Sequence, residues 1–318
     1  KNSGIIHLMF SLSLWSFSNH LQNKVLPSIR NNKKIRITSI LSKKKNKDKI
    51  DNKNIKWFFN KKDFFKNDHS DCVYISSINS KHYQDCRDVL NNKKNVICEK
   101  PICLNVKQLS ILKNIAKKNK VKIFEMVQYV EHPVFNKIQN IIKKKKFGKI
   151  LYVQSAFKVP LYKNKGFRFN AKQGGGALYD TGFYPISILY TLFKSKRMQI
   201  IKSNIVHERG VDVSGDLFCR NDMDVYFDLS WGFKSNYQNY INILCENVSI
   251  YVNFIFSKKI FQNAIIEIRD QKNNKVIKIK KSNQINLAFN KYLTSTDKYH
   301  NEKLQESLNI LKIIEKIK

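Results

Sequence analysis

The chain has 318 residues, of which 42% are hydrophobic and 12% aromatic, with 10 Gly and 5 Pro. This composition is typical of a folded globular protein and excludes fibrous and largely disordered classes. The length favours two domains, each with a hydrophobic core of its own. The formal net charge is +35, from 59 Lys and Arg against 24 Asp and Glu, which raises the question of an anionic partner.

The positive charge is spread along the whole chain. Only eight of the basic residues are arginine, and the lysine runs at 43–47, 117–120 and 143–146 are mixed with Asn and Ile. Surfaces that bind nucleic acid concentrate arginine and interleave aromatic residues, and these runs contain neither. We therefore expect a solvated lysine coat and no specific nucleic-acid partner. The alternative, a basic protein associated with nucleic acid, depends on charge alone.

The six cysteines contain no CxxC pair and no Cys/His cluster at zinc spacing. They predict reduced, mostly buried thiols, no metal site and a cytoplasmic protein. The apolar run at residues 5–17 is too short to span a bilayer. No small-x-small cleavage site follows it, so we interpret the run as a first buried strand rather than a signal peptide and predict no membrane partner.

The first third of the chain alternates short apolar runs with helical patterns, as βαβ units do. Six strands with intervening helices predict a doubly wound parallel sheet, a Rossmann dinucleotide-binding domain over residues 1–122. The predicted strands are 10–15, 35–41, 55–59, 71–77, 95–98 and 121–125, and the predicted helices are 20–30, 83–91 and 106–118, with a helix or loop up to 54.

The remaining chain begins with a predicted helix from His132-Pro133 to residue 146 and is then rich in strands. No long helical pattern separates the last four strands, so we expect an α+β domain over residues 123–318 with a mainly antiparallel open sheet. The final segment, 299–317, has the 3.6-residue apolar period of an amphipathic helix. The predicted strands are 151–158, 199–207, 224–231, 240–256, 264–269 and 275–279.

Three segments contain recognisable motifs: DCVYISSINSKHY at 71–83, NVICEKPICLN at 95–105 and GGGALYDTGFYPIS at 174–187. In this order and spacing they resemble the Gfo/Idh/MocA family of oxidoreductases. An EKP tripeptide alone is weak, but a GGG-x-L-x-D-x-G motif roughly 75 residues further on makes the combination specific. The resemblance covers most of the chain and weakens in the first 15 residues and beyond Asn204.

The resemblance implies an NAD(P)-dependent oxidoreductase that moves hydride between a nicotinamide cofactor and a hydroxyl or carbonyl of a sugar, sugar derivative or cyclic diol. It also implies a small-molecule, sugar-like partner and a homo-oligomer formed through the open sheet. The family's EKP lysine lies near the nicotinamide and the substrate hydroxyl, which makes Lys100 a catalytic candidate. Its ammonium can orient a hydroxyl or stabilise a developing alkoxide. The alternative is one more surface lysine.

In the GGG segment the family places an Asp and, four residues later, often a His that exchanges a proton with the substrate. The matching residues are Asp180 and Tyr184. Tyrosine takes this position in branches similar to glucose-fructose oxidoreductase and the dihydrodiol dehydrogenases. A phenol has an unperturbed pKa of about 10, so it needs a neighbouring cation to act as a base near neutrality, and Lys100 is the candidate. The alternative is a tyrosine packed beside Pro185.

The candidates for substrate binding are Tyr129, Arg168, Asp180 and Tyr184. Tyr129 lies in QYVEHP, which is similar to the family segment after the sixth strand, although the arginine that often follows the tyrosine is Val130 here. Arg168 in GFRFN precedes the glycines, as in the dihydrodiol-type branch. The alternative for Arg168 is a clamp on its own loop.

The turn after the first strand departs from the family pattern, often GxGNH, because it reads Ser16-Phe17-Ser18-Asn19-His20. The first glycine normally permits a tight turn and the second lets the backbone approach the pyrophosphate. The helix N-terminus that follows still offers N–H groups to a phosphate. We therefore expect weakened rather than abolished dinucleotide binding, and restored glycines at both positions should tighten it at least tenfold, about 1.4 kcal/mol.

After the second strand, where an Asp or Glu would hold the ribose of NAD, the chain has Ser42 and Lys43. This favours NADP over NAD. The alternative function is a degenerate family member that binds or scaffolds without catalysis: the two serines support it, whereas the retained Lys100, Asp180 and Tyr184 oppose it. The cofactor-binding candidates are Ser16, Phe17, Ser18, Asn19, His20, Ser42, Lys43, Ser77, Asn79, His82, Glu99 and Lys100.

Overall fold

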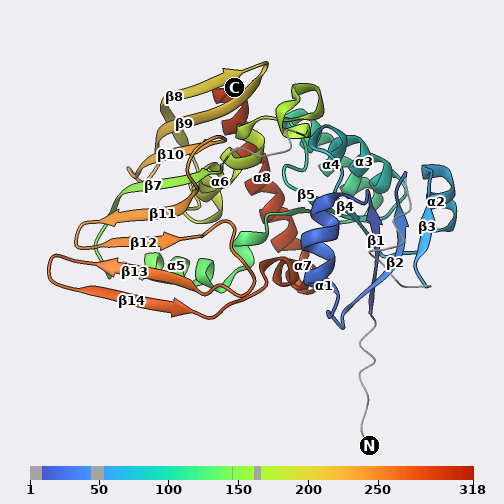
Figure 1. Cartoon of the computed structure of the whole chain (residues 1–318), viewed down its shortest axis with the longest axis horizontal. Helices are drawn as coiled ribbons and strands as arrows, with labels where there is room; N and C mark the ends of the chain where they lie inside the picture. The colour runs from blue at the N-terminus through green and yellow to red at the C-terminus, as the bar shows by residue number, and fades with distance from the viewer. Residues whose placement is uncertain (1–8, 44–53, 145, 161–165) are drawn as a thin grey trace, which may run out of the picture. The chain divides into compact units, whose positions relative to one another are not determined.

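The computed structural model describes residues 9–43, 54–144, 146–160 and 166–318 (Figure 1). They form two compact units. Unit 1 falls within residues 1–103, 107–127 and 288–304, and unit 2 within 104–106, 128–287 and 305–318. Each unit is described by itself. The predicted helix or loop between the second and third strands lies outside the described residues.

Unit 1 contains a six-stranded parallel sheet in the order β3-β2-β1-β4-β5-β6. This is the doubly wound order, and it confirms the predicted Rossmann sheet. The strand order reverses between β1 and β4, where ligands bind in such sheets. The strands are β1 (Phe10–Trp15), β2 (Ile35–Leu41), β3 (Lys56–Phe58), β4 (Cys72–Ile75), β5 (Asn95–Glu99) and β6 (Ile123–Met126).

The helices α2 (Lys61–Asn67) and α7 (Gln284–Thr294) were not predicted from the sequence. In α2 the side chain of Asn60 accepts a hydrogen bond from the Asp63 N–H at 2.9 Å and so caps the helix. Its Phe64 is fully buried and packs edge-on against Trp15. The other helices are η1 (Leu21–Val25), which continues into α1 (Leu26–Ile29), α3 (Asn79–Asn91), α4 (Val106–Asn119) and α8 (Asp297–Ile317).

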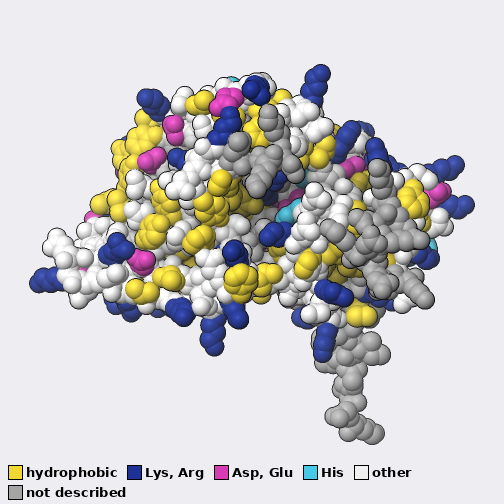
Figure 2. Space-filling model, in the orientation of Figure 1, with side chains coloured by type: hydrophobic (Ala, Val, Ile, Leu, Met, Phe, Trp, Pro, Cys, Tyr) yellow, Lys and Arg dark blue, Asp and Glu magenta, His cyan; other side chains and the backbone are white. Residues whose placement is uncertain are grey.

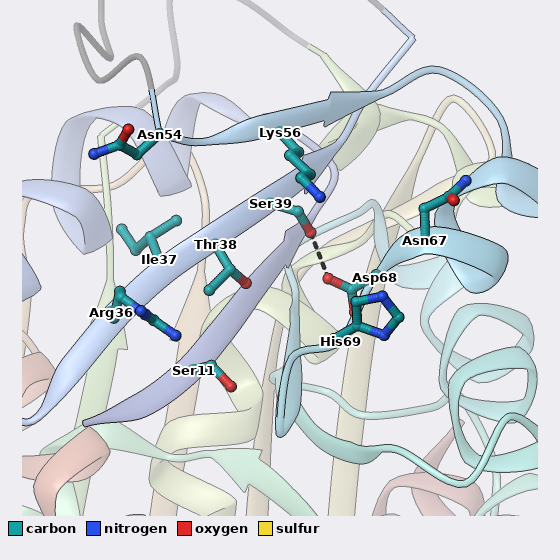
Figure 3. Close-up of a pocket in the computed structure, with 10 residues that line it drawn as sticks. All are labelled: Ser11, Arg36, Ile37, Thr38, Ser39, Asn54, Lys56, Asn67, Asp68 and His69. Atoms are coloured by element: carbon teal, nitrogen blue, oxygen red, sulfur yellow. Dashed lines mark hydrogen bonds between the residues drawn. The ribbon is translucent and has the colours of Figure 1, made fainter. Parts of the chain in front are cut away.

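The two faces of β1 differ because polar and apolar residues alternate along it. Leu12 and Leu14 are fully buried, whereas Ser13 on the other face donates a hydrogen bond to Asp68 at 2.5 Å. Asp68 also accepts from Ser39 at 2.7 Å and pairs with Lys94 at 2.8 Å. Beside this network lies a polar pocket of about 440 Å³ (Figure 3). Its strand residues lie before the carboxyl ends of β1, β2 and β3, so it is separate from the edge that holds the site candidates.

Unit 2 contains an eight-stranded sheet in the order β14-β13-β12-β11-β7-β10-β9-β8. Only the β7–β10 pair is parallel, which confirms the prediction of a mainly antiparallel sheet. The strands are β7 (Ile150–Lys158), β8 (Met198–Glu208), β9 (Val211–Asn221), β10 (Tyr226–Gly232), β11 (Gln238–Cys245), β12 (Ser249–Asn253), β13 (Ala264–Arg269) and β14 (Asn274–Ile279).

Two details of unit 2 differ from the sequence prediction. Strand β9 was not predicted, and the predicted strand 240–256 is two strands, β11 and β12, separated by a turn at Glu246-Asn247. The turn is closed by a hydrogen bond from the Cys245 N–H to the Val248 carbonyl at 2.8 Å. A short polar pair in a long apolar run therefore reverses the chain, because Asn readily adopts turn conformations.

The helices of unit 2 that matter for the site are η6 (Leu178–Gly182) and α6 (Phe183–Thr191), which form one continuous segment. Segment η6 packs on β9 and β10, and α6 packs on β7 and β10. The remaining elements are α5 (Pro133–Lys143) and short helices at Gln128–Glu131 (η3), Phe167–Phe169 (η4) and Ala171–Gln173 (η5).

On the face of the molecule in Figure 2, the Lys and Arg side chains are dispersed rather than gathered into one patch. The six cysteines are all free, and five are buried. Among the described residues, no helix combines the length and apolar character needed to cross a membrane. The same residues contain no group of His, Cys, Asp and Glu arranged to hold a metal ion.

Candidate active site

The turn after β1 keeps a glycine-like backbone although it contains no glycine. Ser16 has a φ of 74°, in the left-handed region, which costs a residue with a Cβ about 1 kcal/mol. Its N–H donates to the Leu41 carbonyl at 2.9 Å. Its carbonyl accepts from the Ser76 hydroxyl at 3.1 Å. Hydrogen bonds to β2 and to the end of β4 therefore hold Ser16 in this conformation.

Ser18 has a structural function that glycine could not perform. Its hydroxyl accepts a hydrogen bond from the Leu21 N–H at 3.1 Å, as a helix cap does, and donates to the Ser76 hydroxyl at 3.1 Å. The helix begins here, because the Gln22 N–H donates to the Ser18 carbonyl at 3.0 Å. Ser18, Ser76 and Ser16 thus form a chain of hydrogen bonds across the point where the strand order reverses.

Glu99, the acid of the EKP segment, connects three elements of unit 1. Its Oε1 accepts from the Tyr74 hydroxyl at 2.5 Å and lies 3.2 Å from Nε2 of His20. Burial alone would raise the pKa of Glu99, but the charge of His20 and the hydrogen bonds from His20 and Tyr74 lower it further than burial raises it. An ionised carboxylate is therefore held next to Lys100, which is half-buried and joined to Pro101 by a cis peptide bond.

His82 joins the loops that follow β4 and β5. It is 1% exposed, with Nδ1 2.7 Å from the Pro101 carbonyl and Nε2 2.9 Å from the Ser77 carbonyl. Burial is the largest influence on the ring and lowers its pKa. A neutral imidazole has one N–H, so His82 donates to one of these two carbonyls, and the ring lies between the backbone after β4 and the backbone beside Lys100.

The other cofactor-binding candidates of unit 1 lie at the same edge. The Ser42 N–H donates to the Phe58 carbonyl at 3.0 Å, and Lys43 beside it is exposed. The Phe17 ring packs edge-on against Trp57 at 5.2 Å. Asn19 is exposed at the helix start, and Asn79 is buried at the start of α3. The structure therefore brings these candidates together after the carboxyl ends of β1, β2, β4 and β5.

In unit 2, Asp180 lies in η6 and is paired with Arg168. The Nε of Arg168 donates to Oδ2 of Asp180 at 2.5 Å. Segment η6 is a π-helical turn, which is a rare element that frequently occurs at functional sites. The structure thus brings together two of the four substrate-binding candidates as a charge-assisted hydrogen bond.

Tyr184, near the start of α6, is 8% exposed and lies among aromatic rings, with Phe157 at 5.0 Å and Tyr129 at 6.0 Å.

Tyr129 is fully buried. Its hydroxyl is hydrogen-bonded to Ser187 at 2.7 Å and to Thr191 at 3.0 Å, both on α6. Burial raises the pKa of Tyr129. The hydroxyl of Tyr129 is therefore used to hold α6, the helix that carries Tyr184. Lys100 belongs to unit 1, and these residues belong to unit 2.

Sequence reasoning missed two residues at these positions. Ser76 bridges Ser16 and Ser18, and the signal available for it was a serine near the end of the fourth predicted strand, 71–77, which the structure ends at Ile75. Asp212 on β9 accepts a hydrogen bond from the Leu178 N–H at the start of η6, at 2.5 Å. No sequence signal pointed to Asp212, because it is far in sequence from the GGG segment and its strand was not predicted.

A parallel sheet in the 3-2-1-4-5-6 order with turns gathered at its switch point defines the class of dinucleotide-binding α/β proteins. Family comparison agrees with this class. The model of the Gfo/Idh/MocA oxidoreductase family, NAD-binding Rossmann fold, matches residues 18–127, and the model of the GFO/IDH/MocA C-terminal domain matches residues 135–251. The chain belongs to the Gfo/Idh/MocA family.

Curated relatives resemble part of the chain. Trans-1,2-dihydrobenzene-1,2-diol dehydrogenase of Xenopus tropicalis is 30% identical over 148 residues, which is 46% of this chain and 44% of that enzyme. The dTDP-3,4-didehydro-2,6-dideoxy-alpha-D-glucose 3-reductase of Actinomadura kijaniata is 24% identical over 206 residues, 64% of this chain and 62% of that enzyme. The matches thus span about half to three-fifths of these relatives.

Solved structures resemble nearly the whole chain in fold. KijD10, a 3-ketoreductase from Actinomadura kijaniata in complex with NADP and TDP-benzene, has a TM-score of 0.88 at 18% identity, covering 96% of this chain and 97% of that one. An aldose-aldose oxidoreductase from Caulobacter crescentus complexed with glycerol has a TM-score of 0.83 at 15% identity, covering 97% of both chains. At these identities the likeness establishes the fold.

Proposed function

We propose that this chain is an NADP-dependent oxidoreductase that transfers hydride to or from a hydroxyl or carbonyl of a sugar, sugar derivative or cyclic diol. The observation that carries the proposal is the carboxyl edge of unit 1, where the helix start at Ser18 and the EKP lysine, Lys100, follow strands of one sheet. A relative that acts on a dihydrodiol and one that acts on a dTDP-sugar support this substrate class.

The residues at this edge fit a dinucleotide with reduced clearance. The first N–H groups of the helix that starts after Ser18 have no partners within the helix and suit a pyrophosphate. Ser16 keeps the left-handed backbone that the turn requires. However, the Cβ atoms of Ser16 and Ser18 occupy space that glycines would leave open for the pyrophosphate. Ser42 and Lys43 stand where an acid would select NAD, so they favour the 2′-phosphate of NADP.

When bound, the nicotinamide supplies hydride transfer. In the proposed assignment, the Lys100 ammonium orients the substrate hydroxyl and stabilises negative charge on its oxygen. The Tyr184 phenol exchanges the proton with that oxygen, and Asp180, held by Arg168, binds a neighbouring hydroxyl. Tyr129 supports α6 from within unit 2 rather than contacting substrate through its hydroxyl.

The test measures binding and turnover separately. Titration with NADPH and NADH, followed by nicotinamide fluorescence, should give tighter binding of NADPH. Turnover is followed as NADP reduction with trans-1,2-dihydrobenzene-1,2-diol and with D-glucose as probes. Tyr184→Phe and Lys100→Ala should lower turnover at least about a hundredfold, the contribution of a positioned acid or base, with NADPH binding changed little for Tyr184→Phe. The exposed-lysine variant Lys107→Ala is the matched control.

If neither the natural chain nor the Ser16→Gly/Ser18→Gly variant binds NADPH or NADH, the oxidoreductase proposal fails. The chain would then be a family member that binds or scaffolds without catalysis, which is the alternative supported by the two serines.

A further inference from the structure

Asp212 is a partly buried carboxylate on β9, outside every motif of the sequence. Its Oδ2 accepts the Leu178 N–H at 2.5 Å. Leu178 is the first residue of η6, and Asp180 follows two residues later. The N–H groups of a first helical turn have no partner within the helix, and a carboxylate there also interacts favourably with the helix dipole. Asp212 therefore caps the segment that carries Asp180 and Tyr184.

A strand irregularity accompanies this side chain. In the ladder between β8 and β9, His207 pairs with Asp212 and Val206 pairs with Ser214, so Val213 is an additional residue on β9. A β-bulge of this kind bends its strand and re-aims the side chains around it. The bulge is therefore next to Asp212, the residue whose carboxylate reaches the start of η6.

Gly176, the third glycine of the GGG motif, lies against this carboxylate. Its φ is +112°, and a Cβ added to it would lie 1.9 Å from Oδ1 of Asp212. No side chain fits in that distance. A side chain at Gly176 would therefore collide with the Asp212 carboxylate in its observed position, and the positive φ disfavours a side chain there as well.

The same glycine connects Asp180 to its partner. The Gly176 N–H donates to the Arg168 carbonyl at 2.8 Å, and its carbonyl accepts from the Asp180 N–H at 3.3 Å. The Arg168 side chain in turn pairs with Asp180. The backbones of Arg168 and Asp180 are therefore both hydrogen-bonded to Gly176, the residue that contacts Asp212.

Burial is the largest influence on Asp212 and raises its pKa, while the Leu178 N–H opposes this change. A buried carboxylate is costly unless it is hydrogen-bonded. Removing the capped N–H would therefore leave an uncompensated carboxylate, and removing the carboxylate would leave an unsatisfied N–H at the helix start.

We propose that Asp212 is a positioning residue, which fixes the start of η6 and thereby the directions of Asp180 and Tyr184. Asp212 acts through these two residues and does not itself contact substrate. The inference rests on the proposed function for the roles of Asp180 and Tyr184, whereas the capping itself is independent of that function.

The experiment compares Asp212→Ala, Asp212→Asn and the control Asp216→Asn on the same strand, all in the full chain. The Asp216 side chain has no hydrogen bond or ion pair within the described part of the chain. Hydrogen–deuterium exchange is measured for peptides covering 176–184, together with NADPH affinity and the kcat and KM for NADP reduction with trans-1,2-dihydrobenzene-1,2-diol. The NADPH titration reports on unit 1, and the exchange reports on the helix start.

Asp212→Ala should accelerate exchange in 176–184 at least about tenfold and lower kcat about tenfold or more, with NADPH affinity within about twofold of the natural chain, because a lost cap frees the first turn. Asp212→Asn should restore most of the protection, since an amide oxygen can still accept the Leu178 N–H. If Asp212→Ala fails to fold, the exchange of peptides 176–184 is compared between the natural chain and Asp212→Asn. Equal protection in these two proteins supports the cap. If Asp212→Asn instead loses protection throughout the chain, as in global unfolding, the proposal is overturned.

Exchange and kcat in Asp212→Ala that match Asp216→Asn would overturn the proposal. If the natural chain is inactive with these probes, the proposed function is in question but the exchange comparison still decides whether Asp212 holds the helix. A kcat loss without any change in exchange would also overturn the positioning role, because the effect would not pass through the helix start.

Discussion

Two turns that contain glycine in the family pattern differ in this chain. The turn at 174–176 keeps three glycines, whereas the turn after β1 has Ser16 and Ser18. In the first, a Cβ at Gly175 would lie 2.4 Å from the Phe167 carbonyl, and one at Gly176 would lie 1.9 Å from Asp212. In the second, the protein accommodates both serines through hydrogen bonds with Ser76.

This comparison distinguishes two reasons why a turn can require glycine. At Gly175 and Gly176 the protein's own atoms leave no room for a side chain, so these two glycines are part of the fold. After β1 the fold tolerates serine, at the conformational cost of a positive φ at Ser16, so the glycines of the family serve the approach of a phosphate. Serine at both positions keeps the turn, and we expect the two Cβ groups to act on the clearance for a ligand.

The largest expected effect is at the GGG turn. Gly176→Ala should lower the free energy of unfolding by about 3–5 kcal/mol, from backbone strain combined with a clash against Asp212. Gly210→Ala is the matched control, because Gly210 also has a positive φ, +80°, but an added Cβ there meets nothing within 4 Å; it should cost about 1 kcal/mol. Urea denaturation measures both. Equal losses would show that the positive φ, rather than the lack of space, explains the need for glycine at 176.

Removal of the Ser18 hydroxyl should have the next largest effect. Ser18→Ala should destabilise unit 1 by about 1–2 kcal/mol, because the Leu21 N–H loses its cap and Ser76 loses a partner. Ser203→Ala, at an exposed position of β8, should stay within about 0.5 kcal/mol of the natural chain. The measurement is again denaturant unfolding. A loss at Ser18 no greater than at Ser203 would mean that the serine is not a structural replacement for glycine.

Ser16→Gly should change stability in the opposite direction. Relief of the left-handed conformation should stabilise the chain by about 0.5–1 kcal/mol. Ser18→Gly should cost only a few tenths of a kcal/mol as a cap, so the double variant should be close to the natural chain in stability while binding NADPH at least about tenfold more tightly. Unfolding and NADPH titrations of the two single variants and the double variant check this. Greater stability with unchanged affinity would show that the Cβ groups do not limit binding.

The smallest expected effect concerns pH at the same turn. The pKa of Glu99 is below its ordinary value, so its ionisation adds stability above the unfolded pKa of about 4.3, and this contribution is lost as pH falls through the lower folded pKa. His20→Gln removes the cation 3.2 Å away. The natural chain should therefore exceed His20→Gln in stability most clearly from about pH 4.5 to 6, where the imidazole is charged and the carboxylate ionised. Urea midpoints across this range measure the difference, and a difference that stays constant down to pH 3 would contradict the pairing.

Local pattern was sufficient for much of the fold. The run FSLSLW predicted β1 with its observed bounds, and the 3.6-residue period at the C-terminus predicted most of α8, because both depend on neighbours within a few residues. The prediction of a single strand from Tyr240 to Phe256 was wrong, because a largely apolar stretch does not reveal a two-residue turn between two strands. The short helix α2 was missed because its apolar content is one pair of phenylalanines.

The amino-acid sequence by itself determined the family, the parallel and antiparallel sheets and the motifs that carry Lys100, Asp180 and Tyr184, because strand periodicity and motif spacing are properties of contiguous residues. Only the tertiary structure decided which groups meet those motifs: Ser76 between Ser16 and Ser18, Tyr74 with His20 on Glu99, and Asp212 against Gly176. These contacts join residues from different strands and turns. Their partners depend on strand order and on a bulge in β9, which no local pattern in the chain specifies.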